Sequence, residues 1–347
     1  MLEYLTIDLP IAGQQDFPVL VLISIGFMVG TLGGFFGVGG AWIVTPALNI
    51  FGFPMAYAIG TDLAHIFGKS IIATRKHSKL GNVDWRLGLF SIIGSIVGIE
   101  GGKRLVMILE KAGNVGDVVR WVYMIFLFGL GVYMVYDYRT AIARARKESG
   151  GASEAAPQET ASAMAIGLRK FHLPPIVSLP ASGIKEISFW ILFLIFLITG
   201  FLSGFMGVGG GFVLLPALIY LVGCPTTVAV GTSLLSVCFM SGYGCFSYSM
   251  AGRTELYAAM IMLIGASVGA QIGVLATRYV QGYGIRLLFA VMILLAGTSV
   301  ALKQGQSILG LDYLGTLAAW FVMGAAGSMT LLIICKLIAG IRKLKSG

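Results

Sequence analysis

Long apolar stretches separated by short polar or glycine-rich gaps dominate the chain. In the first half they cover about residues 18–36, 41–53, 56–74, 86–109 and 118–138. In the second half they cover about 187–206, 211–222, 226–250, 255–277 and 283–302, and a further one follows at 312–340. A helix that spans a membrane needs about 20 apolar residues. The pattern therefore predicts an all-α integral membrane protein, in which the second, shorter stretch of each half forms a half-helix.

Composition supports a membrane protein and excludes other classes. Hydrophobic residues make up 57% of the chain and charged residues only 11%, against roughly 25% charged residues in soluble domains, so a soluble enzyme is not expected. The 49 glycines lie mostly within apolar stretches, as in closely packed membrane helices. The net charge of +9 arises from Lys and Arg in the gaps, so we expect no nucleic-acid partner. No Cys and His spacing suits a metal, and no cofactor is expected.

One hydrophilic stretch, residues 139–186, divides the chain. It mixes charge with Gly, Ala, Ser and Pro, which predicts a flexible cytoplasmic loop. We expect a first membrane repeat over 1–138, a second over 187–303, and an extra transmembrane helix with a basic tail over 304–347. The first 17 residues contain no Lys or Arg, so they lack the basic start of a cleavable signal peptide and are expected to be retained.

The distribution of Lys and Arg predicts the orientation. With 139–186 in the cytoplasm, alternate crossings place 17 of the 24 basic residues on the cytoplasmic side. Cytoplasmic loops carry an excess of Lys and Arg. Residues 103–120 hold four basic residues on the outer side and run against this bias, although Glu110 and Asp117 accompany them. We expect a multi-pass protein of the inner (plasma) membrane, with its N-terminus outside and its C-terminus cytoplasmic.

The two halves are related by an internal repeat. Residues 32–48 and 202–218 are identical at 10 of 17 positions, at an offset of 170. The match resumes at an offset of 171, from Pro54 and Pro225 as far as Gly102 and Gly273. Because each copy has five segments, an odd number, the second copy must enter the membrane from the opposite face. Inverted repeats of this kind occur in secondary transporters, which bind substrate near the midplane at broken helices.

Each copy has a GVGG turn before its short stretch. Glycine allows left-handed turns and a close approach of the backbone, and a helix that begins there presents unpaired N–H groups with a partial positive charge. Such a helix start favours an anion. The alternative is that glycine only allows tight helix packing, and we prefer this for Gly94, Gly98 and Gly102. The anion site predicted between the turns comprises Gly37, Gly39, Gly40, Gly207, Gly209 and Gly210.

The two GVGG turns, each followed by Pro46 or Pro216, and then GTDL in the first half and GTSL in the second, resemble the TauE/SafE family of membrane transporters. The resemblance covers about residues 30–277. It implies a carrier of sulfur-containing anions such as sulfite, sulfonates or thiosulfate, and it implies export driven by the proton gradient or the anion's own gradient. The family pattern often has GTSL in both halves, so Asp62 is a departure from it.

Three ionisable residues share one face of the third segment. Asp62, His65 and Lys69 fall at i, i+3 and i+7, and their counterparts are Ser233, Ser236 and Met240. Each charge at the centre of a membrane helix costs roughly 2.5–3.5 kcal/mol. One interpretation is an Asp62–Lys69 ion pair bridged by His65, or Lys69 extending to the membrane surface. The other is proton exchange by Asp62 or His65, with Lys69 attracting an anion. Glu100 is a second candidate for proton exchange.

Three hydroxyl groups complete the predicted site. Thr61 and Thr232 either cap the third helix of their copy or donate to substrate, and Ser233 follows Thr232.

A rival function is a cation or proton antiporter that uses Asp62 and Glu100. An intramembrane enzyme or receptor is not favoured, because no GxSxG or HExxH motif is present. We therefore expect a secondary transporter with alternating access, whose partners are a small anion and the lipid bilayer, and an assembly of identical copies is compatible with the sequence.

Overall fold

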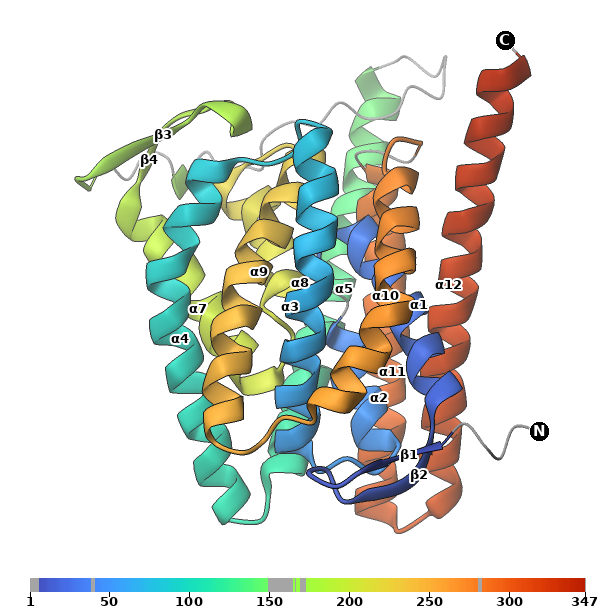
Figure 1. Cartoon of the computed structure of the whole chain (residues 1–347). Helices are drawn as coiled ribbons and strands as arrows, with labels where there is room; N and C mark the ends of the chain where they lie inside the picture. The colour runs from blue at the N-terminus through green and yellow to red at the C-terminus, as the bar shows by residue number, and fades with distance from the viewer. Residues whose placement is uncertain are drawn as a thin grey trace.

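The computed structural model describes residues 6–38, 41–148, 165, 167–168, 173–279 and 283–346. The chain folds into a bundle of helices (Figure 1). The first half contains α1 (Val19–Phe36), α2 (Ala41–Ile50), α3 (Met55–Lys79), α4 (Trp85–Lys111) and α5 (Val115–Glu148). The second half contains α7 (Phe189–Met206), α8 (Gly211–Ala217), the π-helical turn η2 (Leu218–Val222), α9 (Thr226–Met250), α10 (Leu256–Ala276), α11 (Tyr283–Leu309) and α12 (Asp312–Ser346).

Two small antiparallel hairpins precede α1 and α7. One pairs β1 (Thr6–Leu9) with β2 (Gln14–Pro18), and the other pairs β3 (Ile176–Leu179) with β4 (Ile184–Ser188), with the 3-10 turn η1 (Pro180–Ser182) between them. They lie at opposite ends of the bundle (Figure 1). The sequence analysis predicted neither hairpin. It also ended the fifth helix at residue 138, whereas α5 continues through Glu148, because the residues that follow are rich in Ala, Arg, Lys and Glu, which favour helix.

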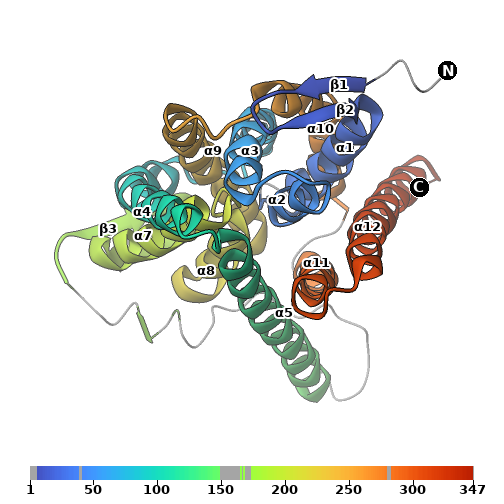
Figure 2. The same cartoon turned by 90° about the horizontal axis from the view of Figure 1, so that it is seen from below.

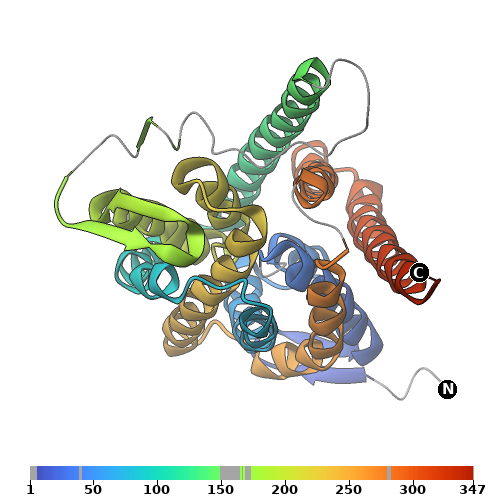
Figure 3. The same cartoon turned by 90° about the horizontal axis from the view of Figure 1, so that it is seen from above.

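Within the part of the chain that the structure describes, seven helices are long and apolar enough to cross a membrane: α1, α5, α7, α9, α10, α11 and α12. The helices α3 and α4 are equally long, at 25 and 27 residues, but they carry more charge. Large apolar side chains such as those of Ile125 (69% exposed) and Trp320 (75% exposed) point outward, which suits a lipid environment. Seen from above, α12 lies at the rim of the bundle (Figure 3). The predicted all-α, multi-span membrane fold is confirmed.

The elements of the two halves correspond in order, and two helix pairs also have equal lengths. Both α1 and α7 have 18 residues, and both α3 and α9 have 25. The short helices between them each contain a proline, Pro46 and Pro216. Only the second short helix runs into a π-helical turn. A π-turn accommodates one extra residue, which accounts for the change of offset from 170 to 171 between Pro216 and Pro225.

Glycines allow the helices of the two halves to touch. The helices α1 and α10 lie side by side, as do α4 and α7 (Figure 2). A Cβ atom on Gly98 of α4 would lie 2.2 Å from the carbonyl oxygen of Leu197 on α7, and one on Gly269 of α10 would lie 2.2 Å from that of Phe27 on α1. Gly94 and Gly102 also contact the backbone of α7. The interpretation of Gly94, Gly98 and Gly102 as packing residues is therefore confirmed.

Candidate functional site

The two glycine turns meet in the interior of the bundle. Gly37 ends α1 at φ 75° and Gly207 ends α7 at φ 77°, backbone values that glycine adopts without steric cost. The carbonyl oxygen of Val38 in the first turn lies 2.5 Å from where Gly211, which follows the second turn, would carry a Cβ atom. Two turns that are 170 residues apart in the sequence thus contact each other. Gly39 and Gly40, also predicted as ligands, lie outside the described residues.

Side chains of α3 and α9 cover the second turn. If Gly209 carried a Cβ atom, the side chains of Ile66 and Val237 would lie 3.1 Å from it. If Gly210 carried one, the sulfur of Met240 would lie 2.6 Å from it. The sequence analysis expected space for an anion here. Instead, the room left by the missing Cβ atoms is occupied by neighbouring side chains. A ligand therefore reaches the backbone of this turn only after Ile66, Val237 and Met240 move.

Asp62 lies between the first short helix and the second turn. The hydroxyl of Thr45, on α2, donates a 2.9 Å hydrogen bond to Oδ2 of Asp62. The same hydroxyl lies 2.9 Å from the position of a Cβ atom on Gly207. Oδ1 of Asp62 lies 3.6 Å from Nδ1 of His65, and Asp62 and His65 are fully buried. The sequence analysis missed Thr45, because only the packing of α2 on α3 brings this residue next to Asp62.

Lys69 is buried without a partner. Its side chain is 2% exposed, and its Nζ atom forms no hydrogen bond. No direct ion pair joins Lys69 to Asp62, and the ammonium does not reach the membrane surface, but the two opposite charges still attract each other within the bundle. The sequence had left both interpretations open. Oδ1 of Asp62 and both ring nitrogens of His65 are also without hydrogen bonds. Buried polar atoms are nearly always satisfied, and ionisable groups within membrane segments are costly unless they pair or line a pathway.

Thr61 and Thr232 connect the two halves. The hydroxyl oxygen of Thr61 accepts a 2.9 Å hydrogen bond from the N–H of Glu255, the N-cap of α10. The hydroxyl oxygen of Thr232 accepts a 2.8 Å bond from the N–H of Asp84, the N-cap of α4. Both threonines lie within their helices, whose own N-cap residues are prolines. They therefore cap the fourth helix of the opposite half, and not their own helix.

The same two carboxylates bind the tips of the hairpins. Oε2 of Glu255 accepts hydrogen bonds from the N–H groups of Ile11 and Ala12, at 2.9 and 3.3 Å. Oδ2 of Asp84 accepts a 2.8 Å bond from the hydroxyl of Ser182. Asp84 and Glu255 occupy equivalent repeat positions. Each thus joins a hairpin, a third helix and a fourth helix, one at either end of the bundle.

A valine at position 232 tests this structural role. Thr232→Val leaves the buried N–H of Asp84 without an acceptor, which costs about 1–3 kcal/mol. We expect a lower melting temperature in detergent and no change in binding of the anion that the sequence analysis predicts. Thr199→Val is the control, because the hydroxyl of Thr199 bonds only carbonyls of its own helix. Weaker anion binding by Thr232→Val at unchanged stability would place the hydroxyl in the substrate site instead.

Ser233 contacts the first turn directly. Its hydroxyl donates to the carbonyl oxygen of Gly37 and, at 3.0 Å, to that of Val230 in its own helix. A Cβ atom on Gly37 would lie 2.5 Å from the carbonyl oxygen of Val230. The start of α9 therefore holds the first turn in place, and Ser233 makes this contact in the structure described here.

Glu100 belongs to a separate cluster. It accepts hydrogen bonds from Ser247 (3.0 Å), Arg104 (3.2 Å) and Tyr243 (3.5 Å), and Lys103 lies 3.9 Å away. Its side chain is 30% exposed. Glu100 is thus partly exposed and bound by two cations, in contrast to buried Asp62. This arrangement does not favour the predicted role of Glu100 in proton exchange, nor an antiporter that depends on it.

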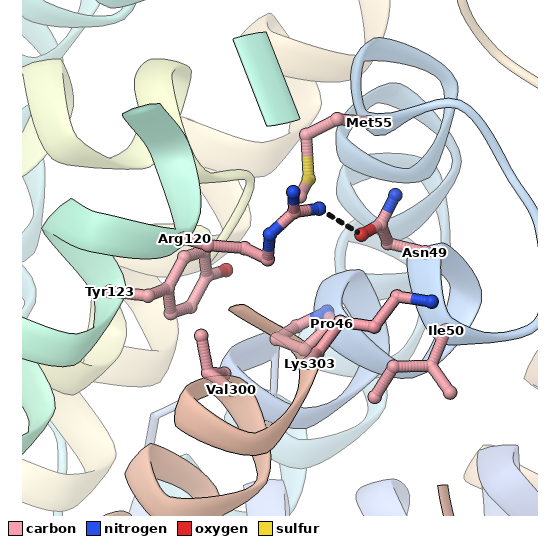
Figure 4. Close-up of a pocket in the computed structure, with 8 residues that line it drawn as sticks. All are labelled: Pro46, Asn49, Ile50, Met55, Arg120, Tyr123, Val300 and Lys303. Atoms are coloured by element: carbon pink, nitrogen blue, oxygen red, sulfur yellow. Dashed lines mark hydrogen bonds between the residues drawn. The ribbon is translucent and has the colours of Figure 1, made fainter. Parts of the chain in front are cut away.

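A narrow hollow with a cavity volume of about 10 Å³ lies beside α2 (Figure 4), which is about the space that one water molecule needs. Arg120 on α5 donates hydrogen bonds to Asn49, Gln304 and Asp117, at 3.2, 2.7 and 2.6 Å. Tyr123 also lines the hollow, and its hydroxyl donates a 2.7 Å hydrogen bond to the carbonyl oxygen of Met206. Sequence analysis did not predict this hollow, because its residues come from four separate helices. Its lining consists of Pro46, Asn49, Ile50, Met55, Arg120, Tyr123, Val300 and Lys303.

Comparison with known proteins identifies the class. A probable membrane transporter protein of Methanocaldococcus jannaschii is 26% identical over 286 residues, which cover 78% of this chain and 90% of the relative. The probable membrane transporter protein YunE of Bacillus subtilis is 26% identical over 290 residues, covering 80% and 95%. One from Xylella fastidiosa is 28% identical over 271 residues, covering 75% and 85%. No solved structure matches the chain.

These likenesses and the multi-span helical fold define a membrane transporter. The family model for "Sulfite exporter TauE/SafE" matches residues 22–300, so the chain belongs to the TauE/SafE family, as the repeated motif indicated. The matched region includes both glycine turns and all of α3. The family is one of membrane transporters and not a class of enzymes.

Proposed function

We propose that this protein exports a small sulfur-containing anion, of the sulfite, sulfonate or thiosulfate class, across the inner membrane. The observation that carries the proposal is the unpartnered ammonium group of Lys69, buried in the same bundle interior as the two touching glycine turns. A cation buried in a membrane helix is costly until an opposite charge joins it. An anion at Lys69 provides that charge, and the family description supplies the chemical class.

The backbone near the turns supports the same ligand. The first N–H groups of a helix have no partner within the helix, and α2 and the continuous segment formed by α8 and η2 both begin beside the glycine turns. Their positive ends attract anions in a water-poor interior. In this proposal the anion binds between Lys69 and the turns after Ile66, Val237 and Met240 withdraw.

Alternating access follows from two inverted five-helix halves. The sequence repeat, the equal helix lengths and the hairpins at opposite ends of the bundle support this arrangement. We place the N-terminus outside and the C-terminus in the cytoplasm, from the excess of Lys and Arg on that side. Rocking of one half against the other then opens the turns to one side of the membrane at a time. The bundle described here is closed around them.

Efflux from proteoliposomes tests the proposal. Vesicles that contain the purified protein are loaded with ³⁵S-labelled sulfite, thiosulfate or methanesulfonate, and release is compared with that from protein-free vesicles. We expect saturable release of at least one of these anions, with competition by the others and not by sodium ions. Sodium or proton fluxes that need no anion would instead support the cation antiporter and contradict the proposal.

A further inference from the structure

A buried polar stripe runs along α3. Asp62, His65, Lys69, Ser70, Thr74 and His77 fall at i, i+3, i+7, i+8, i+12 and i+15, and all are between 0% and 6% exposed. From the first to the last, the helix rises about 22 Å, at 1.5 Å per residue. This covers most of a hydrocarbon core that is about 30 Å thick. The sequence analysis recognised the first three residues and missed the rest.

Every member of the stripe has a polar atom without a hydrogen-bond partner. These atoms are Oδ1 of Asp62, both ring nitrogens of His65, Nζ of Lys69, Oγ of Ser70, Oγ1 of Thr74 and Nδ1 of His77. Buried polar atoms that lack a protein partner are commonly satisfied by ordered water. A run of such atoms along one helix face therefore offers hydrogen-bond partners for water molecules beside α3.

The equivalent face of α9 differs. Its Ser241, the counterpart of Ser70, donates a 2.6 Å hydrogen bond to the carbonyl oxygen of Val237. Its Tyr248, the counterpart of His77, donates a 2.6 Å bond to that of Gly204. Ser236, the counterpart of His65, is unpartnered. The helix α9 contains no Asp, Glu, His, Lys or Arg, so the ionisable stripe belongs to one half alone.

The stripe connects two ends of the bundle. At one end, Asp62 accepts a hydrogen bond from Thr45, whose chain neighbour Pro46 lines the hollow beside α2. At the other end, Nε2 of His77 lies 3.1 Å from the carbonyl oxygen of Gly34, in the last turn of α3, which ends at Lys79. Polar groups thus extend from an open hollow to the opposite end of the helix.

The stripe balances its own charge. The neighbouring helices α1, α2, α7, α9 and α10 contain no charged residue or histidine. From α5 the titratable group facing Asp62 is the Tyr123 phenol, and on α4 Glu100 is held by Arg104 and Lys103. At the start of the stripe, Glu255 faces Thr61 through its backbone N–H. The charge of Asp62 is therefore offset mainly by Lys69.

We propose that this stripe is a proton path and that one proton accompanies each transported anion; this inference rests on the proposed function. An anion bound at Lys69 cancels the positive charge that offsets the Asp62 carboxylate. The carboxylate then takes a proton at Oδ1 through water along His77, Thr74 and Ser70, from the end of α3 that the proposed orientation places at the cytoplasm. After the halves rock, the proton leaves through water in the hollow on the outer side, in the same direction as the exported anion. Only O–H and N–H bonds form and break, and anion and proton binding strengthen each other equally.

Proton cotransport agrees with export. A doubly charged anion that moves with one proton still carries one net negative charge. An interior-negative membrane potential drives such a charge outward. The coupled proton reduces the electrical work that the membrane potential does on the anion. It also makes the rate of transport depend on the pH on both sides of the membrane.

Proteoliposomes that contain a pH-sensitive dye test the inference. Sulfite, thiosulfate and methanesulfonate are supplied in turn as outward gradients, with the membrane potential clamped by potassium and valinomycin. We expect the lumen to become more alkaline as an anion leaves. Thiosulfate and methanesulfonate hold no titratable proton near neutral pH, so the signal then comes from the protein. In Asp62→Asn we expect exchange of labelled for unlabelled anion to persist while the pH change falls at least tenfold.

A pair of serine variants provides the matched comparison. Ser70→Ala removes an unpartnered hydroxyl from the stripe, and we expect the proton flux to fall severalfold. Ser241→Ala removes the equivalent hydroxyl of α9, which is already bonded to its own helix, and we expect no change. This pair of variants tests the proton path even if Asp62→Asn fails to fold.

The outcomes separate the two proposals. Anion efflux from the wild-type protein with no pH change, or equal proton fluxes in Ser70→Ala and Ser241→Ala, would overturn the proton path and leave anion export standing. Acidification of the lumen during anion efflux would also overturn it, because the proton would then move opposite to the anion. If none of the three anions moves, the proposed function itself fails.

Discussion

Lys69→Met abolishes anion transport and raises the stability of the folded protein. The wild-type ammonium is buried without a hydrogen bond or a direct ion pair, and replacing a buried charge by an apolar side chain of similar length often stabilises a fold. Without Lys69, the Asp62 carboxyl takes up a proton and becomes neutral, so no uncompensated charge stays in the interior. The anion loses its opposite charge, a contact worth about 3 kcal/mol or about 100-fold in binding. We expect a higher melting temperature in detergent, together with at least a roughly 100-fold loss of efflux.

Lys103→Met is the matched control. Lys103 also lies in a long apolar helix, but it donates a 2.9 Å hydrogen bond to Ser247 and lies 3.9 Å from Glu100. Its replacement should lower the melting temperature and leave efflux near that of the wild type. Normal efflux by Lys69→Met would contradict the proposed anion site. A fall in its melting temperature would show that Lys69 has a structural partner.

Gly98→Ala prevents the close packing of α4 on α7. The added methyl group would lie 2.2 Å from the carbonyl oxygen of Leu197 and 2.5 Å from the nitrogen of Phe201. Both are backbone atoms, so the two helices must separate. Overpacking of this kind costs typically about 1–3 kcal/mol or more. We expect little monodisperse protein on size-exclusion chromatography in detergent, and no transport.

Gly129→Ala shows that the effect is specific to the helix contact. Gly129 lies within α5, and no atom lies within 4 Å of its hypothetical Cβ atom. Since alanine favours helix over glycine by about 1 kcal/mol, this variant should be at least as stable as the wild type. Equal yields of the two alanine variants would show that α4 and α7 do not approach as closely as described.

Much of the fold could be predicted because membrane helices have a strong sequence pattern. The apolar stretches located the helices, and the repeat around Pro46 and Pro216 located the two short ones. The hairpins were missed because strands of four or five residues carry little periodicity. A signal was present, since Leu9-Pro10 and Gly13 recur at an offset of 170 as Leu179-Pro180 and Gly183. Extending the repeat upstream would have indicated equivalent elements there.

The candidate site was predictable only in part. Spacing placed Asp62, His65 and Lys69 on one helix face, and the repeat indicated that the two turns are equivalent. The sequence could not show that Thr45 binds Asp62, or that Thr61 and Thr232 accept hydrogen bonds from Glu255 and Asp84, because these contacts join elements up to 194 residues apart. It also could not show that Ile66 and Met240 fill the space beside the turns, which depends on how α3 and α9 pack.

An experimental structure with a bound anion tests the central claim most directly. The purified protein would be imaged by electron cryomicroscopy in saturating thiosulfate or sulfite. We predict density for the anion within hydrogen-bonding distance of Nζ of Lys69, between the turns at Val38 and Gly211, with Ile66 and Met240 displaced. Density confined to the hollow beside Arg120 and Lys303, with both turns still packed by side chains, would contradict the account.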